Sequence, residues 1–141
     1  VFQKVYLFHD TIENNIRFGN PSATKEEIIE AAKKARCHDF IMALPDGYET
    51  VIGEGGSTLS GGEKQRVALL RNIQYLPKIL LLDEITSALD DKNKQIVHQV
   101  IDDLITHAGI AVLWVTHNSD EISQSHNLLR MTKYEAPEAK Q

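Results

Sequence analysis

The first half of the chain spaces its apolar residues as short amphipathic helices do. Thr24 and Glu27 have the spacing of a capping box, and the apolar stripe that follows them continues to about Arg36. A turn signal at 45–47 and a proline at position 77 end two further segments of this kind. After a strand-like start at 1–8, the pattern therefore predicts four helices, over 11–16, 24–36, 38–44 and 61–75.

The second half alternates strands with helices. The runs 79–82 and 111–115 are continuously apolar, which is typical of strands buried on both faces of a parallel sheet. The segment 92–107 between them has the length and pattern of a helix, so the three elements predict a βαβ unit. A short helix over 119–123 and a last strand over 128–131 are expected to follow.

Composition sets limits on this picture. With 141 residues, 42% of them hydrophobic, the chain is about one domain long, and its net charge of −5 argues against a nucleic-acid or anionic-membrane partner. Cys37 is the single cysteine, which suits a reducing compartment, and its place near a helix end predicts a small buried hydrophobe. No apolar run is long enough to cross a bilayer. Because Val1 is no initiator Met and the start reads as a strand already under way, we expect a fragment.

Polar residues follow both apolar runs of the second half. Asp83 and Glu84 end the first run, and Thr116 and His117 end the second. If the strands are parallel, these residues emerge at the same carboxyl edge, where ligands of open α/β sheets bind. Ionised acids that close a buried strand need a cation or donors, which favours Mg²⁺ held by Asp83 with Glu84 polarising a water. Alternatively, the acids simply begin a solvated helix and His117 is structural.

The stretch TLSGGEKQR, residues 58–66, places a serine and two glycines at the start of a helix. Glycines let a backbone approach an anion closely, and the unpaired N–H groups and dipole of a helix start favour negative charge. The stretch therefore suggests a phosphate site, although an ordinary loop and N-cap would have the same pattern.

Together, LSGGEKQR, ILLLDE, SALD and a later TH, in this order, resemble the nucleotide-binding domain of ABC transporters. The resemblance runs from Val1 to about Met131. It implies an α/β fold, namely a P-loop NTPase (RecA-like) ABC ATPase fragment with a helical subdomain and a partial parallel sheet, lacking the Walker A strand, loop and helix. By the same resemblance the chain divides into four parts. A Q-loop segment covers 1–10, and a helical signature subdomain covers 11–75. The C-terminal part of the ATPase core covers 76–133, and a polar tail covers 134–141.

The resemblance also implies roles for single residues. Glu84 is the general base, His117 contacts the γ-phosphate, and Asp83 holds Mg²⁺. Gln3, the Q-loop glutamine, senses Mg²⁺ and the attacking water. The D-loop residues Ser87 and Asp90 help to join two subunits. The signature motif binds the ATP carried by the opposing subunit, through Leu59, Ser60, Gly61, Gly62, Glu63 and Gln65.

The function implied by the resemblance is that of a Mg²⁺-dependent ATP hydrolase that powers export by ATP-driven dimerisation. Its ligands are ATP and Mg²⁺. Its partners are a second nucleotide-binding subunit, arranged head to tail, and a transmembrane transporter domain, with no nucleic acid. Its location is peripheral, at the cytoplasmic face of the plasma (inner) membrane.

The phosphate cradle of the family, G-x-x-x-x-G-K-[ST], has no counterpart in this sequence, which contains no Gly-Lys dipeptide. In the family that loop precedes the Q-loop. We therefore expect that this chain alone neither binds ATP tightly nor hydrolyses it, and that Ser60-Gly61-Gly62 serves as half of a shared site.

The branch of the family and the role of the chain stay open. The first half, with LFHDTIENNIRFG, resembles exporters whose ATPase is fused to a membrane domain. The second half, with RNIQYLPKILLLDEITSALD, resembles stand-alone ATPase subunits, including those of bacterial metal (iron) exporters. A non-catalytic interaction module, in which 11–75 docks on a membrane partner, is the main alternative. A DNA-repair or chromosome ATPase is disfavoured because the chain has no heptad pattern and no basic face.

Overall fold

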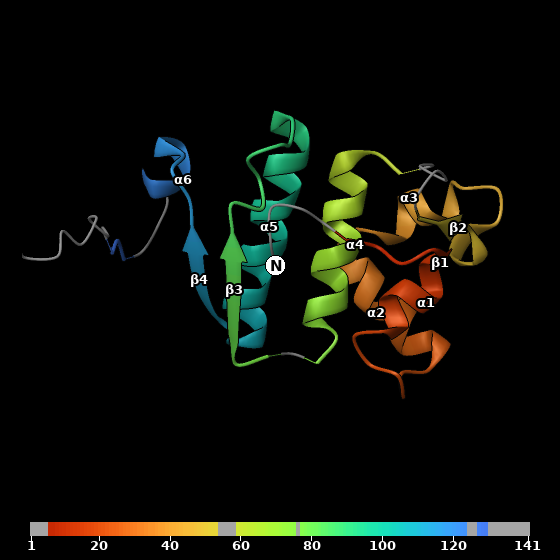
Figure 1. The fold of residues 1–141 in the computed structure, drawn as a ribbon. Coiled ribbons are helices and arrows are strands. Elements are labelled where there is room, and N and C mark those ends of the chain that lie inside the picture. The colour runs from red at the N-terminus through yellow and green to blue at the C-terminus, as the bar shows by residue number, and fades with distance from the viewer. Residues whose placement is uncertain (1–5, 54–58, 76, 124–126, 130–141) are drawn as a thin grey trace, which may run out of the picture.

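Helix α4 (Gly61–Ile73) lies between two groups of elements in the computed structural model, which describes residues 6–53, 59–75, 77–123 and 127–129 (Figure 1). The group that follows α4 in the chain contains β3 (Ile79–Asp83), α5 (Asp91–Ala108), β4 (Ala111–Val115) and α6 (Ser119–Ser123). The group that precedes it contains β1 (Asp10–Thr11), α1 (Ile12–Arg17), α2 (Lys25–Lys34), α3 (His38–Met42), the 3₁₀ turn η1 (Gly47–Glu49) and β2 (Val51–Ile52).

The capping signals of the first half act as predicted. The side chain of Thr24 accepts from the backbone N–H of Glu27, and the Glu27 carboxylate accepts from the N–H of Thr24, so the capping box of α2 is complete. Helix α2 ends at Lys34 rather than at Arg36 because Arg36 takes a left-handed conformation, with φ of 52°. Helix α1 begins one residue later than expected, since Thr11 is its N-cap.

A hydrogen-bonded clamp joins the N-terminal segment, α1 and α4. The Asn15 amide is buried, accepts from the N–H of Phe8 at 2.8 Å, and donates to the carbonyl oxygens of Phe8 and Thr11. From α4, the guanidinium of Arg71 donates to the carbonyl and side-chain oxygens of Asn15 and lies over the Phe8 ring. Gly19 packs directly on the backbone of α4, because a Cβ there would overlap the carbonyl oxygen of Arg71. These contacts fix α1 against the C-terminal end of α4.

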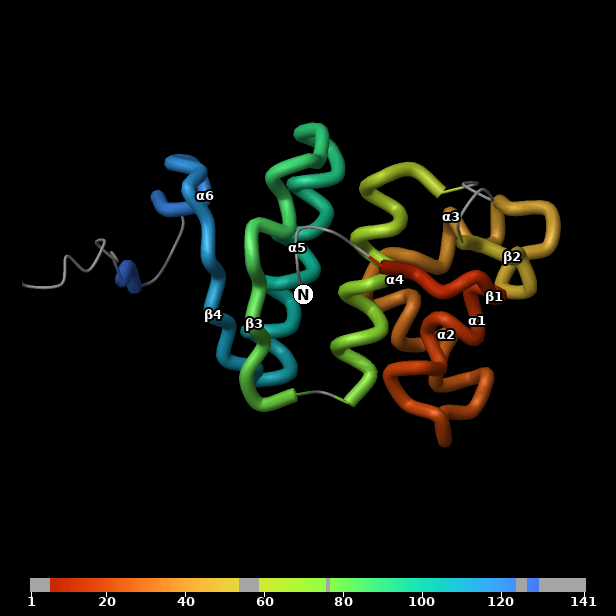
Figure 2. Tube along the Cα trace, viewed as in Figure 1, coloured from red at the N-terminus to blue at the C-terminus, as the bar shows by residue number. Residues whose placement is uncertain are grey.

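Strands β3 and β4 pair in parallel, with α5 as the crossover, so the predicted βαβ unit is confirmed. Their register runs from Ile79 opposite Ala111 to Asp83 opposite Val115. The face that points away from α5 is exposed, which makes the expectation of burial on both faces wrong. Its four large apolar residues, which we call the open face, are Ile79, Leu81, Leu113 and Val115. Among the described residues only one face of this two-stranded sheet has a covering layer, which α5 provides (Figure 2). Leu80 and Leu82 are buried.

Two other strands predicted from apolar runs do not form where the structure describes them. Leu128 and Leu129 are exposed and extend no strand, and positions 130 and 131 lie outside the described residues. Residues 6–8 lack strand structure, while 1–5, with Gln3, and the tail from 134 also lie outside. A strand needs a partner, and these runs have none in the described chain. None of the described helices is both long and apolar enough to span a membrane.

Cys37 is completely buried between α2 and α3, which confirms it as a small buried hydrophobe. Its Sγ donates only a weak hydrogen bond, to the carbonyl oxygen of Ala35. Burial raises the pKa of the Cys37 thiol to about 12, because a thiolate there would lose its hydration.

We predict that Asn15→Ala lowers the free energy of unfolding by about 2–4 kcal/mol, because it leaves several buried backbone and guanidinium groups without their partner. Urea unfolding followed by circular dichroism measures the change. Asn14→Ala is the matched control, since Asn14 lies on the same helix but is exposed. Equal losses for the two variants would contradict the clamp.

We also predict that the Cys37 thiol reacts with Ellman's reagent at pH 8 only after urea unfolds the chain. Because the pKa in the folded chain exceeds that of an unfolded cysteine, the folded state binds the extra proton. Stability is therefore retained below pH 8–9 and decreases as the pH rises toward 12. Rapid labelling of the native chain at pH 8, or a stability that rises over this range, would contradict the prediction.

Candidate functional site

The polar residues after β3 and β4 meet at the carboxyl edge of the sheet, as the sequence predicted. The imidazole Nδ1 of His117 lies 2.6 Å from Oε1 of Glu84, across 33 residues of chain. His117 is largely exposed and Glu84 is partly covered, so the pair faces solvent. A carboxylate fixed beside an exposed imidazole can accept a proton from a water while the imidazole donates to an anion.

Backbone bonds hold Glu84 in an uncommon conformation. Its φ is +47°, in the left-handed region that residues with a Cβ seldom adopt. Its N–H donates to the carbonyl oxygen of Val115 at 2.9 Å, and its own carbonyl oxygen accepts from the backbone N–H and the hydroxyl of Ser87. Strain of this kind persists where the surroundings determine the conformation, and it directs the Glu84 side chain toward His117.

Asp83 is the last residue of β3 and is exposed at this edge. Among the residues that the structure describes, no three His, Cys, Asp or Glu side chains converge as a metal site would require. Mg²⁺ commonly takes only one or two protein carboxylates and completes its shell with phosphate and water oxygens. Asp83 therefore fits a shared Mg²⁺ site. Gln3, the other expected metal residue, lies outside the described part of the chain.

The start of α4 carries a second capping box. Ser60 Oγ accepts from the N–H of Glu63, and the Glu63 carboxylate accepts from the N–H of Ser60 at 2.7 Å. The box leaves the N–H groups of Gly61 and Gly62 without an acceptor within the described chain, and the Ser60 hydroxyl still has its hydrogen to donate. The 13-residue helix adds the positive end of its dipole. These groups suit an incoming anion.

The two glycines have different roles. A Cβ on Gly61 would meet no atom within 4 Å, so its backbone is open to a ligand. A Cβ on Gly62 would overlap the side chain of Asn93, which packs against it from α5. Asn93 is held by Asp90, the N-cap of α5, through its backbone N–H at 2.8 Å and its amide at 2.9 Å. The same bonds lower the pKa of Asp90. The start of α4 and the start of α5 therefore meet through Asn93.

The other signature residues lie deeper. Leu59 and Gln65 are each 4% exposed, so their side chains belong to the interior in this structure. A cleft of about 660 Å³ borders Ser60 and Glu63 and contains Arg66 and Lys92. Sequence reasoning did not single out these two cations, although Arg66 ends the stretch TLSGGEKQR. They supply positive charge beside the open amides.

The structure separates the candidate residues into two groups. Asp83, Glu84 and His117 do not line the cleft beside Ser60. Both sets nevertheless lie on one side of the molecule, since the start of α4 and the ends of β3 and β4 point the same way (Figure 1).

The remaining histidines lie in different surroundings. His9 and His107 are exposed, and His126 lies outside the described residues. His38 is hydrogen-bonded to the Tyr48 hydroxyl. His98 is partly buried and stacks on Trp114, with ring centroids 4.8 Å apart.

Comparison with known proteins identifies a family to which this chain is similar. The family model described as "ABC transporter" matches residues 1–87. The chain is 44% identical over 139 residues to the mitochondrial potassium channel ATP-binding subunit of Rattus norvegicus, which covers 99% of this chain and 19% of that protein. It is 44% identical to P-glycoprotein 14 of Caenorhabditis elegans over 133 residues, 94% of this chain and 10% of that protein.

A solved bacterial Atm1-family ABC exporter with ATP bound is similar in structure, with a TM-score of 0.76 and 42% identity over 87% of this chain and 21% of that chain. The chain thus spans about a fifth or less of the length of these relatives. The match to the rat protein covers 99% of this chain, so both halves of the chain resemble one relative.

We predict that Gly62→Ala lowers the free energy of unfolding by about 1–3 kcal/mol, since the methyl group displaces Asn93. Gly61→Ala is the matched control and should leave stability unchanged or raise it by up to about 1 kcal/mol, because alanine favours a helix and the site is open. Thermal unfolding of the two variants distinguishes them. A Gly62→Ala variant as stable as the control would rule out the contact between Gly62 and Asn93.

Proposed function

The chain belongs to the ABC transporter family, and we propose that it is part of the ATP-binding and hydrolysing subunit or domain of an exporter. In this proposal ATP drives two such subunits together, head to tail, and hydrolysis separates them. The observation that carries the proposal is the contact between Glu84 and His117 at the carboxyl edge of two parallel strands. Glu84 directly follows Asp83, the last residue of β3.

The chemistry of the edge is that of a water attacking a terminal phosphate. Glu84 accepts the proton of the attacking water, and His117 donates to an oxygen of the γ-phosphate. The bond to Val115 and the left-handed backbone support this assignment, because they orient the carboxylate of Glu84 before any ligand arrives. Asp83, together with Gln3, would hold Mg²⁺, which neutralises phosphate charge when bound.

The start of α4 provides the other half of a site. We assign Ser60 and the open amides of Gly61 and Gly62 to the γ-phosphate of an ATP carried by the opposing subunit. One observation supports this: Glu84 and His117 do not line the cleft that Ser60 borders. Ser87 and Asp90 of the D-loop would then lie at the same subunit contact.

The open face supports the assignment of 76–133 to part of a larger ATPase core. Four apolar side chains exposed side by side on a parallel sheet are uncommon in a finished α/β layer, because such sheets are covered on both faces. We propose that a further layer of the ATPase core covers the open face, and that 11–75 forms the helical subdomain that precedes it.

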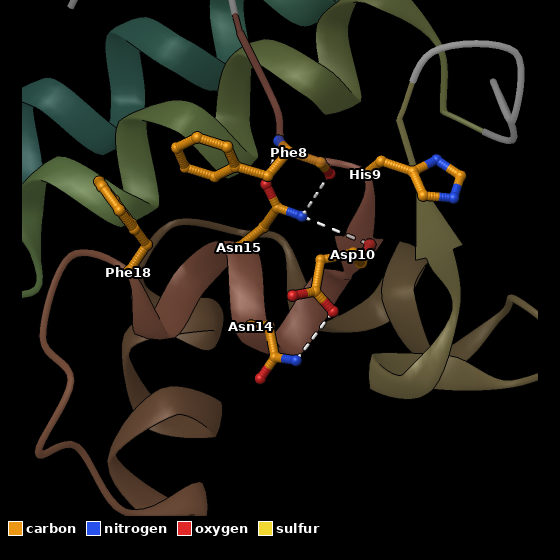
Figure 3. A pocket seen from close by; sticks show the side chains of 6 residues that line it. All are labelled: Phe8, His9, Asp10, Asn14, Asn15 and Phe18. Atoms are coloured by element: carbon orange, nitrogen blue, oxygen red, sulfur yellow. Dashed lines mark hydrogen bonds between the residues drawn. The ribbon is translucent and has the colours of Figure 1, made fainter.

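A docking role for the helical subdomain also has an observation in its favour. A concavity of about 300 Å³ opens between the segment at Phe8–Asp10 and helix α1, and Figure 3 shows the rings of Phe8 and Phe18 on one side of it. The centroids of the Phe8 and Phe18 rings lie 4.7 Å apart. An apolar concavity of this kind suits a segment of a transmembrane transporter domain, which would place the chain peripherally at the cytoplasmic face of the membrane.

The signature assignment predicts that Ser60→Arg abolishes ATP turnover in a mixed assembly. The chain is combined with an ABC ATPase domain that has a G-x-x-x-x-G-K-[ST] loop but whose own signature serine is replaced by arginine. Turnover then depends on the signature of this chain, and the arginine of Ser60→Arg blocks the approach of the phosphate. Phosphate release measures the rate.

Ser22→Arg is the matched control, because it adds the same side chain at an exposed position outside the cleft. It should retain the rate of the unmodified chain. The chain alone should show no turnover. Turnover by the chain alone that Glu84→Gln abolishes, or joint turnover that survives Ser60→Arg, would contradict the proposal.

A further inference from the structure

Glu121 is the one carboxylate that is buried in the part of the chain that the structure describes, with 8% of the residue exposed. It lies on α6, the helix that follows the His117 loop. A buried carboxylate is costly unless donors surround it, so the groups around Glu121 indicate what it does.

Two hydroxyl groups and an imidazole surround this carboxylate. Oε1 accepts from the Thr86 hydroxyl, and Oε2 accepts from the Thr116 hydroxyl at 2.5 Å. Nε2 of His98 lies 3.6 Å from Oε1. The ring of His98 is itself held by stacking on Trp114. The carboxylate thus links the loop after β3, the end of β4 and helix α5.

The two threonines flank the catalytic pair. Thr86 is two residues beyond Glu84, and Thr116 immediately precedes His117. The Thr116 oxygen also accepts from the backbone N–H of Asn118, so one hydroxyl organises both sides of His117. Hydrogen bonds in a chain through a poorly solvated interior strengthen one another.

We propose that Glu121 is a positioning residue, whose carboxylate ties the loop after β3 to the loop after β4 and thereby holds His117 against Glu84. The proposal rests on the proposed function only in taking Glu84 and His117 as the pair that acts on ATP. The Glu84 backbone, in its left-handed conformation, needs its surroundings to hold it, and the Thr86 bond to Glu121 is a side-chain contact that does so.

The test compares the histidine ring signals of the ¹⁵N-labelled chain with those of Glu121→Gln, by long-range ¹H–¹⁵N correlation without nucleotide. Glutamine has the shape of glutamate but only one acceptor oxygen, so it can accept a hydrogen bond at the position of Oε1 or of Oε2 but not at both. The His117 ring signals should shift toward those of the exposed His9. The His38 ring, bonded to Tyr48 in the other group of elements, should keep its signals and report that the chain is folded.

Two matched sets of variants separate positioning from simple packing. Asp120→Asn removes an exposed carboxylate from the same helix and should leave the His117 signals unchanged. Thr86→Val removes the hydroxyl at nearly constant volume and should reproduce the Glu121→Gln shift. Thr86→Ser keeps the hydroxyl and should retain the signals of the unmodified chain.

Unchanged His117 signals in folded Glu121→Gln and Thr86→Val would overturn the proposal, as would equal shifts for Thr86→Val and Thr86→Ser. Should Glu121→Gln fail to fold, the threonine pair decides the question. Because the measurement contains no ATP, its failure leaves the ATPase assignment standing. Equally, evidence against the ATPase assignment would not affect the hydrogen-bonded link between the two loops that this measurement tests.

Discussion

The burial of helix α4 is the constraint on which the remaining structure depends. Side chains on every side of this helix are shielded from water, among them Val67, Leu69, Leu70 and Ile73. Residues 65–70 span more than one turn and are all buried, so other elements must cover this part of the helix around its circumference, and one group of elements lies on each of its flanks. Its first turn consequently has little freedom, and the capping box of Ser60 and Glu63 holds the open amides at a defined place.

The carboxyl edge of β3 and β4 is organised in a different way, by polar contacts. Parallel pairing of β3 with β4 brings Glu84 and His117 together, and the bond from Glu84 to Val115 sets the direction of the side chain. The buried carboxylate of Glu121 joins the loop after β3 to the loop after β4, by accepting hydrogen bonds from Thr86 and Thr116. The strained backbone of Glu84 and the buried hydrogen bonds of Glu121 thus lie in one small region of the structure.

The separation of these two groups of residues supports the proposal that the chain contributes to a shared ATP site. Ser60 and Glu63 border a cleft that Glu84 and His117 do not line, although the start of α4 and the ends of β3 and β4 point the same way (Figure 1). In the proposed arrangement, each would complete a nucleotide site with elements from a second subunit. The open face of the sheet and the concavity near Phe8 add two further surfaces whose apolar character suits other layers or partners.

Much of the local structure was predictable because its causes are local. The capping boxes at Thr24 and Ser60 depend on residues three positions apart, and the strands 79–83 and 111–115 follow from their apolar runs. Covering layers were less predictable. The run at Ile79 was expected to be buried on both faces, yet continuous apolarity does not state which layers are present to cover it.

The sequence by itself determined the family, the βαβ order and the identity of the residues at the strand ends, because motif spacing and periodicity are properties of the chain. Only the tertiary structure decided that Glu84 takes a left-handed backbone, that Gly62 rather than Gly61 packs on Asn93, and that Glu121 is buried between two threonines. Thr86 and Glu121 are 35 residues apart. The physical reason is that contacts between residues far apart in the chain depend on how the elements pack, and no local sequence pattern encodes which of these residues come together.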